Sequence, residues 1–239
     1  MVYLLPFGAH SECLEIVLLL REVMGTYLFD FDGTLVDSMP TFSSIMLGFL
    51  DEHGISYGND LIKIITPLGY AGTAKYFVGL GVEMAAEEIA NIVAQRAVDA
   101  YEKRIPAKKN VIAVLQQLKE QGHHLNILTA SPHLMLDPCL KRLGIYDLFE
   151  NVWSCDDFYT TKSNPEIYKM AAERMGQPVD CVLFLDDNFH ADQTAKSAGM
   201  LVCGVYDESS RDYEDKIREI ADYYIRDFSE LLSFEWPKG

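Results

Sequence analysis

The 239-residue sequence contains no apolar run that approaches the length of a membrane helix. Such a helix needs about 18 or more consecutive apolar residues, so a membrane-spanning function is not expected. Basic residues are also scarce, since 20 Lys and Arg stand against 36 Asp and Glu and the formal net charge is −16. This charge repels nucleic-acid phosphates and anionic membrane surfaces. We therefore expect neither nucleic acid nor a membrane as a partner, whereas an acidic cleft would attract cations.

Cysteine is sparse and is never spaced as a CxxC pair. An odd number of scattered cysteines excludes a disulfide framework and a zinc knuckle and predicts a reducing compartment, the cytoplasm. The composition, 49% hydrophobic and 23% charged, is typical of a globular chain and excludes extended disorder. The five cysteines are Cys13, Cys139, Cys155, Cys181 and Cys203.

The first 23 residues have two interpretations. A short apolar run at 14–20 follows no basic segment and is flanked or interrupted by glutamates, so a secretion signal is not expected. Met24 leads directly into an apolar strand pattern, which suggests that residues 1–23 are an N-terminal extension arising from a start codon placed too early. The alternative is an accessory helix that begins at Ser11.

Beyond residue 24, short apolar runs alternate with longer helical patterns. This alternation predicts an α/β fold with a doubly wound, Rossmann-like parallel sheet. Strands are expected at 27–31, 125–128, 151–154, 182–185 and 201–205, with a short sixth candidate at 223–225. Helices are expected at 110–121, 132–143, 165–175, 192–198 and 213–221. Glycine follows directly after, or closely after, each of the first four helices, as is common at helix C-termini.

Residues 38–105 interrupt this alternation because they contain no clear strand. Helical patterns cover 40–52, 60–65, 72–79 and 83–104. In the last pattern Ile89, Val93, Arg96 and Ala100 follow one face at helical spacing. We therefore predict an inserted α-helical cap at 38–105 and an α/β core made of residues 24–37 and 106–239.

Two acidic clusters follow predicted strands. The segment 30–37 reads DFDGTLVD, and Asp186 and Asp187 end the strand at 182–185. Open α/β sheets place their ligands at the carboxyl ends of strands. Charging several carboxylates in one place is costly unless a cation lies among them, and a hard, oxygen-seeking ion such as Mg²⁺ suits them. A single Asp pair is more often a solvated turn or helix cap, but two pairs at two strand ends predict a metal site.

Two further segments could bind an anion. The strand at 125–128 is followed by Thr129, Ala130 and Ser131, and Pro132 then opens a helix. Hydroxyls and helix amides at such a place can hold a phosphate, although a simple hydroxyl cap is the alternative. Lys162 lies in a loop before the next helix, where a lysine is usually solvent-facing; here it would be a cation among carboxylates and a phosphate.

In this order, the DFDGTLVD strand end, the hydroxyl-bearing strand end, the loop lysine and the Asp-Asp strand end resemble the haloacid dehalogenase-like hydrolase superfamily. The resemblance runs from about Tyr27 to the C-terminus. The first motif is highly specific, the Asp pair is moderately specific, and the other two gain weight from their order. The insert directly after the first motif resembles the helical cap of phosphoglycolate phosphatase-like and β-phosphoglucomutase-like members.

The resemblance implies a Mg²⁺-dependent phosphatase that works through an aspartyl-phosphate. Asp30 would be the nucleophile, and Asp32 would be the general acid for the leaving group and then the base for water. The metal would be held by Asp30, the backbone carbonyl of Asp32 and Asp187. Asp186 would be a further ligand or an orienting group.

The resemblance also implies the substrate-binding residues. Thr129, with the neighbouring Ala130 and Ser131, would hold the transferring phosphoryl group. Lys162 would pair with both the phosphoryl group and Asp30, and Thr34 would brace the nucleophile loop.

Four positions depart from the usual pattern. Ala130 stands where many relatives carry Asn, and Ser163 replaces a proline that commonly follows the lysine. Asp186 stands where many phosphatases have glycine, which is similar to the mutase-like branch. Ala191 takes a position often filled by an acid or amide, which Asp192 could replace.

Three hypotheses follow for the function. The first is a phosphatase of a small phosphorylated metabolite, acting as a monomer or homodimer. The second is a β-phosphoglucomutase-like phosphomutase, which would return the phosphoryl group to its sugar. The third is a non-catalytic module that binds a phosphorylated ligand or a protein partner, which the retained acids argue against. Within the cap, residues 66–73 are expected either to form a substrate-facing loop or to be an ordinary turn.

Overall fold

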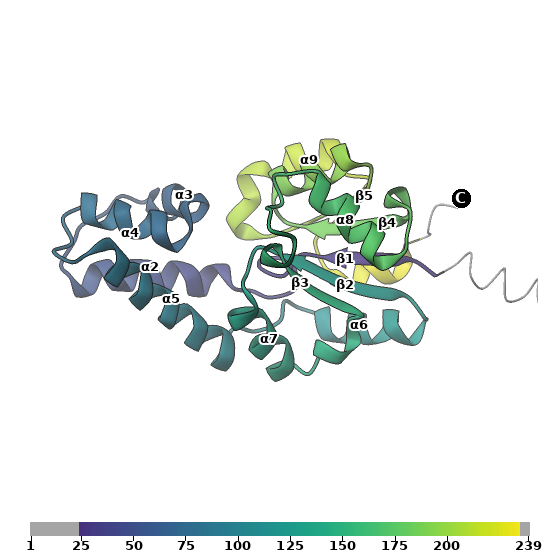
Figure 1. Cartoon of the computed structure of the whole chain (residues 1–239), viewed down its shortest axis with the longest axis horizontal. Helices are drawn as coiled ribbons and strands as arrows, with labels where there is room; N and C mark the ends of the chain where they lie inside the picture. The colour runs from purple at the N-terminus through teal and green to yellow at the C-terminus, as the bar shows by residue number, and fades with distance from the viewer. Residues whose placement is uncertain (1–23, 235–239) are drawn as a thin grey trace, which may run out of the picture.

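The computed structural model describes residues 24–234, so both interpretations of residues 1–23 concern a segment outside the described residues. Its centre is a six-stranded parallel sheet with the strand order β3-β2-β1-β4-β5-β6 (Figure 1). The strands are β1 (Thr26–Phe29), β2 (His124–Thr129), β3 (Asn151–Ser154), β4 (Val182–Asp186), β5 (Leu201–Val205) and β6 (Tyr223–Ile225). The strand order reverses at β1, which pairs with β2 on one side and β4 on the other.

The predicted doubly wound α/β fold is confirmed, with all six strands close to their expected positions. Helices α6 (Val111–Glu120) and α7 (His133–Arg142) cover one face of the sheet, and α8 (Glu166–Met175) and α9 (Phe189–Ala198) cover the other (Figure 1). Helix α10 (Glu214–Ile220) packs beside α9. Successive residues of β1 point to opposite faces, so Tyr27 and Phe29 join one buried cluster and Leu28 joins the other.

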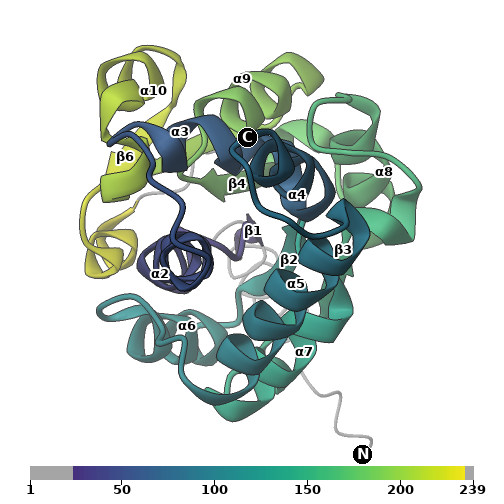
Figure 2. The same cartoon turned by 90° about the vertical axis from the view of Figure 1, so that its left-hand side faces the viewer.

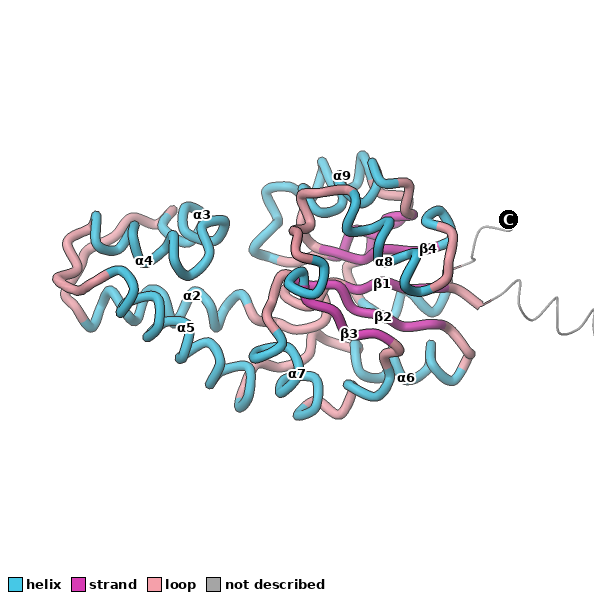
Figure 3. The backbone as a smooth tube through the Cα atoms, viewed as in Figure 1, coloured by secondary structure: helices cyan, strands magenta, loops and turns pink. Residues whose placement is uncertain are grey.

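The insert is built from helices alone and lies beyond the carboxyl ends of the strands (Figure 1). Its helices are α2 (Met39–Glu52), α3 (Leu61–Ile65), α4 (Gly69–Gly79) and α5 (Ala86–Lys103). Figure 2 looks onto the molecule from this side and shows the four helices in front of the strands. In Figure 3, loops that follow the strands gather between the sheet and the insert. The insert therefore lies over the edge of the sheet where the acidic segments end.

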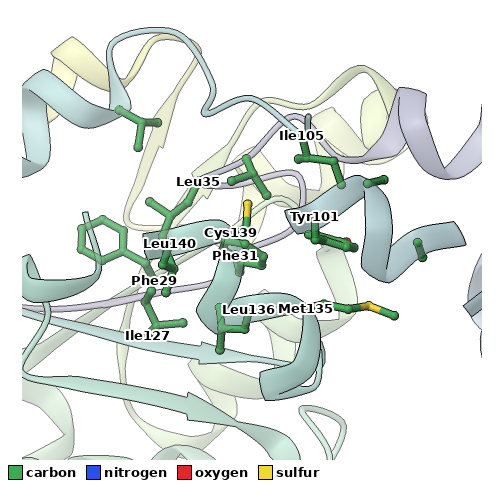
Figure 4. Packing of buried hydrophobic residues seen from close by; sticks show 14 of the residues in the cluster. Phe29, Phe31, Leu35, Tyr101, Ile105, Ile127, Met135, Leu136, Cys139 and Leu140 are labelled. Carbon is green, nitrogen blue, oxygen red and sulfur yellow. The ribbon is translucent and has the colours of Figure 1, made fainter. Parts of the chain in front are cut away.

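Helix α5 joins the insert to the core by packing against α7. Figure 4 shows Tyr101 and Ile105 at this joint, close to Phe31, Leu35 and Cys139. All five side chains are buried. The end of α5 thus shares its apolar core with the loop that follows β1.

The segment 66–73 is not a loop. Thr66–Leu68 forms a 3-10 turn and α4 begins at Gly69, three residues before the expected start of that helix. The hydroxyl of Thr73 is buried and donates to the carbonyl of Ile65 at 3.2 Å.

Within residues 24–234, no helix has the length and apolar character needed to cross a membrane.

Candidate active site

The loop after β1 makes a tight turn that places two acids at the edge of the sheet. The backbone N–H groups of Leu35 and Val36 both donate to the carbonyl of Phe31, at 2.9 and 3.0 Å. This turn ends β1 two residues earlier than predicted, so Asp30 and Asp32 lie in the loop at the carboxyl end of the strand. The amide of Asp30 donates to the carbonyl of Leu185 at 2.8 Å, which fixes Asp30 beside β4.

Gly33 is required by this turn. Its φ of +76° lies in the left-handed region that favours glycine. A Cβ atom at this position would also lie 2.6 Å from both carboxylate oxygens of Asp187. The glycine therefore lets the β1 loop approach the acid that follows β4.

Three buried carboxylates meet where β1 and β4 end. Asp30, Asp186 and Asp187 each offer an oxygen within 4.8 Å of the other two, and all three are buried. Burial, then the charges of Asp186 and Asp30, raises the pKa of Asp187 well above its usual value. Burial is also the main cause that raises the pKa of Asp30 to about 7. Crowded, desolvated carboxylates favour a divalent cation, so the donor set fits the predicted metal.

Lys162 lies inside this cluster and not in solvent. Its Nζ donates to Asp30 Oδ1 and, at 2.8 Å, to Asp186 Oδ2, and its side chain is 14% exposed. Burial opposes the charge on the amine, but the attraction of Asp186 and Asp30 outweighs it and raises the pKa of Lys162 well above its usual value. The structure thus brings the loop lysine to the expected nucleophile as a permanent cation.

Thr34, grouped with the substrate-binding residues and expected to brace the nucleophile loop, contacts the acidic cluster. It is fully buried, and its hydroxyl donates to Asp187 Oδ1 at 3.2 Å. Ser210, which sequence reasoning missed, donates to the other oxygen of Asp187, also at 3.2 Å. Thr34 therefore supports a carboxylate of the cluster and is not open to a substrate. Asp186 is oriented in a similar way, because its Oδ1 accepts from the amide of Asn188 at 2.7 Å.

The segment after β2 forms a turn closed by a hydroxyl, without a side-chain cap on α7, and it also reaches the site. The amide of Ser131 donates to Thr129 Oγ1 at 3.1 Å, which leaves the O–H of Thr129 able to donate to an anion. Thr129 is buried and Ala130 is exposed. The hydroxyl of Ser131 donates to Asp32 Oδ2, so this segment touches the predicted general acid directly.

Besides Ser210, two further residues of the site were missed by sequence reasoning. The hydroxyl of Tyr101, near the end of α5, donates to Asp32 Oδ1. Lys108 donates to the carbonyls of Gly33 and Tyr206, both at 2.6 Å, and to Asp207 Oδ2 at 3.0 Å, which ties the β1 loop to the end of β5. Neither residue belongs to a motif, and only their place on either side of the second junction of the insert, at residue 105, could have drawn attention to them.

Asp192, the expected substitute for an acid at Ala191, lies near the cluster without joining it. It is fully buried in α9, and neither carboxylate oxygen has a hydrogen-bond partner within the described residues. Burial, then the charges of Asp186 and Asp187, raises its pKa well above the usual value. The group of three carboxylates that could hold a metal does not include it.

The chain is similar to known phosphatases. It is 29% identical over 180 residues to pyrophosphatase PpaX of Bacillus velezensis, covering 74% of this chain and 81% of that protein. It is 27% identical over 177 residues to a phosphoglycolate phosphatase of Rhodobacter capsulatus, covering 72% and 80%. A solved structure of β-phosphoglucomutase from Clostridium difficile shares the fold, with a TM-score of 0.66 and 17% identity over 87% of this chain and 93% of that one.

The family model for haloacid dehalogenase-like hydrolases matches residues 24–199. The match spans the acidic turn after β1, the helical insert, the Lys162 loop and the Asp186–Asp187 pair, which the structure brings to one edge of the sheet. The resemblance stated from the motifs is therefore confirmed, and the chain is an enzyme that belongs to the haloacid dehalogenase-like hydrolases.

Proposed function

We propose that this protein is a Mg²⁺-dependent phosphatase that hydrolyses a small phosphorylated metabolite through an aspartyl-phosphate. The observation that carries the proposal is the position of Asp30, a buried carboxylate held by Lys162 at the centre of the acidic cluster. Asp32 lies two residues away, only partly buried, with hydroxyl groups on both of its oxygens. This arrangement supports attack by one carboxylate and proton transfer by the other.

The proposed reaction has two steps that use these carboxylates in turn. An oxygen of Asp30 attacks phosphorus while the bond to the leaving oxygen breaks, and Asp32 gives that oxygen its proton. Asp32 then takes a proton from a water molecule, whose oxygen attacks the phosphorus of the aspartyl-phosphate. Inorganic phosphate leaves, and Asp30 is restored as a carboxylate.

The chain's own residues would hold the metal and the phosphoryl group. Mg²⁺ would bind to Asp30, the backbone carbonyl of Asp32 and Asp187, with Asp186 as a further ligand or orienting group, and would offset the phosphate charge near the nucleophile. Lys162 supplies a second cation, which contacts Oδ1 of the Asp30 carboxylate.

The surroundings of the site favour a small substrate. The O–H of Thr129 and the segment through Ala130 and Ser131 would face the phosphoryl oxygens. We further propose that residues 38–105 are the cap that covers the substrate and that the enzyme acts in the cytoplasm as a monomer or homodimer.

A phosphomutase shares the first half-reaction, so the fate of the aspartyl-phosphate separates the two activities. In a phosphatase water accepts the phosphoryl group, and in a mutase a sugar hydroxyl accepts it.

The proposal is tested by phosphate release from a panel of phosphorylated metabolites and an aryl phosphate, with and without Mg²⁺. We expect Mg²⁺-dependent release that falls to background in Asp30→Asn. Asp147→Asn is the matched control, because Asp147 is exposed in the turn before β3, at the opposite end of the sheet, and should retain full activity. Sugar-phosphate isomerisation without release would indicate the mutase, and binding without turnover would indicate the non-catalytic module.

A further inference from the structure

Asp32 is held by hydroxyl groups from two separate parts of the fold. Tyr101 of the helical insert donates to Oδ1, and Ser131 of the segment after β2 donates to Oδ2. These donors are 69 and 99 residues from Asp32 in the sequence. A carboxylate that lies at a partly open surface is thus fixed at both oxygens.

Tyr101 is itself held firmly in place. Its ring stacks on Phe31, with centroids 5.9 Å apart and an interplanar angle of 26°, and the residue is 8% exposed. Its backbone carbonyl accepts from Nε and Nη2 of Arg142 in α7, at 3.3 and 3.2 Å. Figure 4 shows the ring packed at the joint between α5 and the core. The hydroxyl therefore has little freedom to leave Asp32.

The hydroxyl of Tyr101 also keeps its proton. A tyrosine hydroxyl ordinarily loses its proton only at about pH 10. At neutral pH the group remains a hydrogen-bond donor, so it acts on Asp32 by orientation and not by transferring a proton itself.

We propose that Tyr101 is a positioning residue, which holds the Asp32 carboxylate where it can protonate the leaving group. This inference rests on the proposed phosphatase function. An aspartate side chain at an open surface samples several rotamers, and proton transfer requires one of them to bring an oxygen within hydrogen-bond reach of the leaving atom. Tyr101 restricts Asp32 to the conformation that the joint between the insert and the core imposes.

The test compares two leaving groups in the Tyr101→Phe variant. The leaving group of an alkyl phosphate such as glycerol phosphate is an alkoxide, which needs a proton to depart. The leaving group of 2,4-dinitrophenyl phosphate is a stable phenolate, which departs without one. Because the alcohol departs before water attacks, kcat/KM reports only the first step for both substrates. We expect Tyr101→Phe to lower kcat/KM for the alkyl phosphate about tenfold, a part of the ~10²–10⁴-fold effect of a general acid. The value for the dinitrophenyl ester should change less than about twofold.

Two variants serve as references. Asp32→Asn should show the same selectivity with a larger loss, because it removes the acid itself. Tyr57→Phe removes another tyrosine hydroxyl of the insert, one that donates to Asp51 at 2.9 Å. It should leave kcat/KM unchanged for both substrates. Tyr101→Phe retains the ring that packs on Phe31, and a thermal unfolding midpoint checks that it folds.

Each outcome decides the inference. A selective loss with the alkyl phosphate supports the positioning role of Tyr101. An equal loss of kcat/KM with both esters would show a structural effect on the whole site. No loss with either ester would show that the contact between Tyr101 and Asp32 does not contribute to catalysis. Both results overturn the inference. If the wild-type protein releases phosphate from neither ester, the proposed function fails first.

Discussion

Gly33 shows how a single missing side chain permits the acidic cluster. We predict that Gly33→Ala abolishes metal-dependent phosphate release, lowering it at least about 100-fold, as a misplaced catalytic group commonly does. The added Cβ would lie 2.6 Å from both oxygens of Asp187, so either that carboxylate or the β1 loop has to move. Steady-state phosphate release at saturating Mg²⁺ measures the effect.

The control for this variant is Gly176→Ala. Gly176 has a similar φ of +68°, but no heavy atom lies within 4 Å of the position of its Cβ. It should therefore lose only about 1–2 kcal/mol of stability from the left-handed backbone conformation and keep its activity. If both variants retained or lost activity to the same extent, the close approach of Gly33 to Asp187 would not explain the need for glycine.

Residue by residue, the sequence predicted the acids better than their partners. Asp30, Asp186 and Asp187 were found because each lies at the carboxyl end of a recognisable strand, and parallel strands end at one edge of the sheet. Tyr101 and Lys108 were missed because their partners lie 69 and 75 residues away, and no local pattern encodes such a contact. Only the packed fold brings them to the β1 loop.

At the scale of the elements, periodicity predicted the helices and strands correctly, whereas the glycine content of one segment led to a wrong prediction of a loop. The segment 66–73 contains two glycines and three hydroxyls, which favoured a loop. In the structure the hydroxyls of Thr66 and Thr73 instead donate to the carbonyls of Ile62 and Ile65. Because hydroxyl side chains inside helices can bond to backbone carbonyls in this way, their presence does not by itself indicate a loop.

His133 joins α7 to the turn that follows β3. Its Nδ1 lies 2.8 Å from an oxygen of Asp137 and its Nε2 lies 2.8 Å from an oxygen of Asp157. Both nitrogens can donate only when the ring is protonated. The hydrogen bond with Asp137 is the largest cause that raises the pKa of His133 above its usual 6.5, with a further contribution from Asp157.

This contact predicts a pH dependence of stability. A raised pKa in the folded state means that the stabilisation is complete below pH 6.5, the unfolded value, and is lost as the pH rises through the folded value. We expect His133→Ala to lower the thermal unfolding midpoint more at about pH 6 than at about pH 9, because at the higher pH the ring is neutral and forms no ion pair. Thermal scans of both proteins across this range measure it, and a difference that does not change with pH would contradict the double contact.

At the scale of the whole molecule, two contacts besides those of α5 link the insert to the core. Lys63 in α3 forms an ion pair with Asp212, and the hydroxyl of Tyr70 in α4 lies 3.7 Å from the Sδ of Met135 in α7. The ion pair is exposed, with 70% and 67% of the two side chains accessible, and so adds little stability. The packing of α5 is thus the main attachment of the insert to the core, and the contacts from α3 and α4 contribute less.

The acidic cluster also affects the stability of the whole chain. Asp30, Asp186 and Asp187 are buried together, and Lys162 contacts the first two of them, in a protein of net charge −16. A ligand that binds only the folded state stabilises it by about 2.7 kcal/mol at 100 times its dissociation constant. For a chain of this size that is a rise of roughly 5–10 °C in the thermal unfolding midpoint, which we expect Mg²⁺ to produce and a chelator to reverse.

Asp187→Asn separates metal binding from simple screening of charge. The variant removes one buried carboxylate, so without metal its midpoint should equal or exceed that of the wild-type protein, because the repulsion from Asp186 and Asp30 is relieved. With Mg²⁺ its midpoint should rise much less than that of the wild-type protein, because a ligand is lost. Potassium chloride at matched ionic strength is the control, since it screens the net charge without entering an oxygen-lined site. An equal rise with potassium, or in the variant with Mg²⁺, would mean that the cluster does not bind the ion.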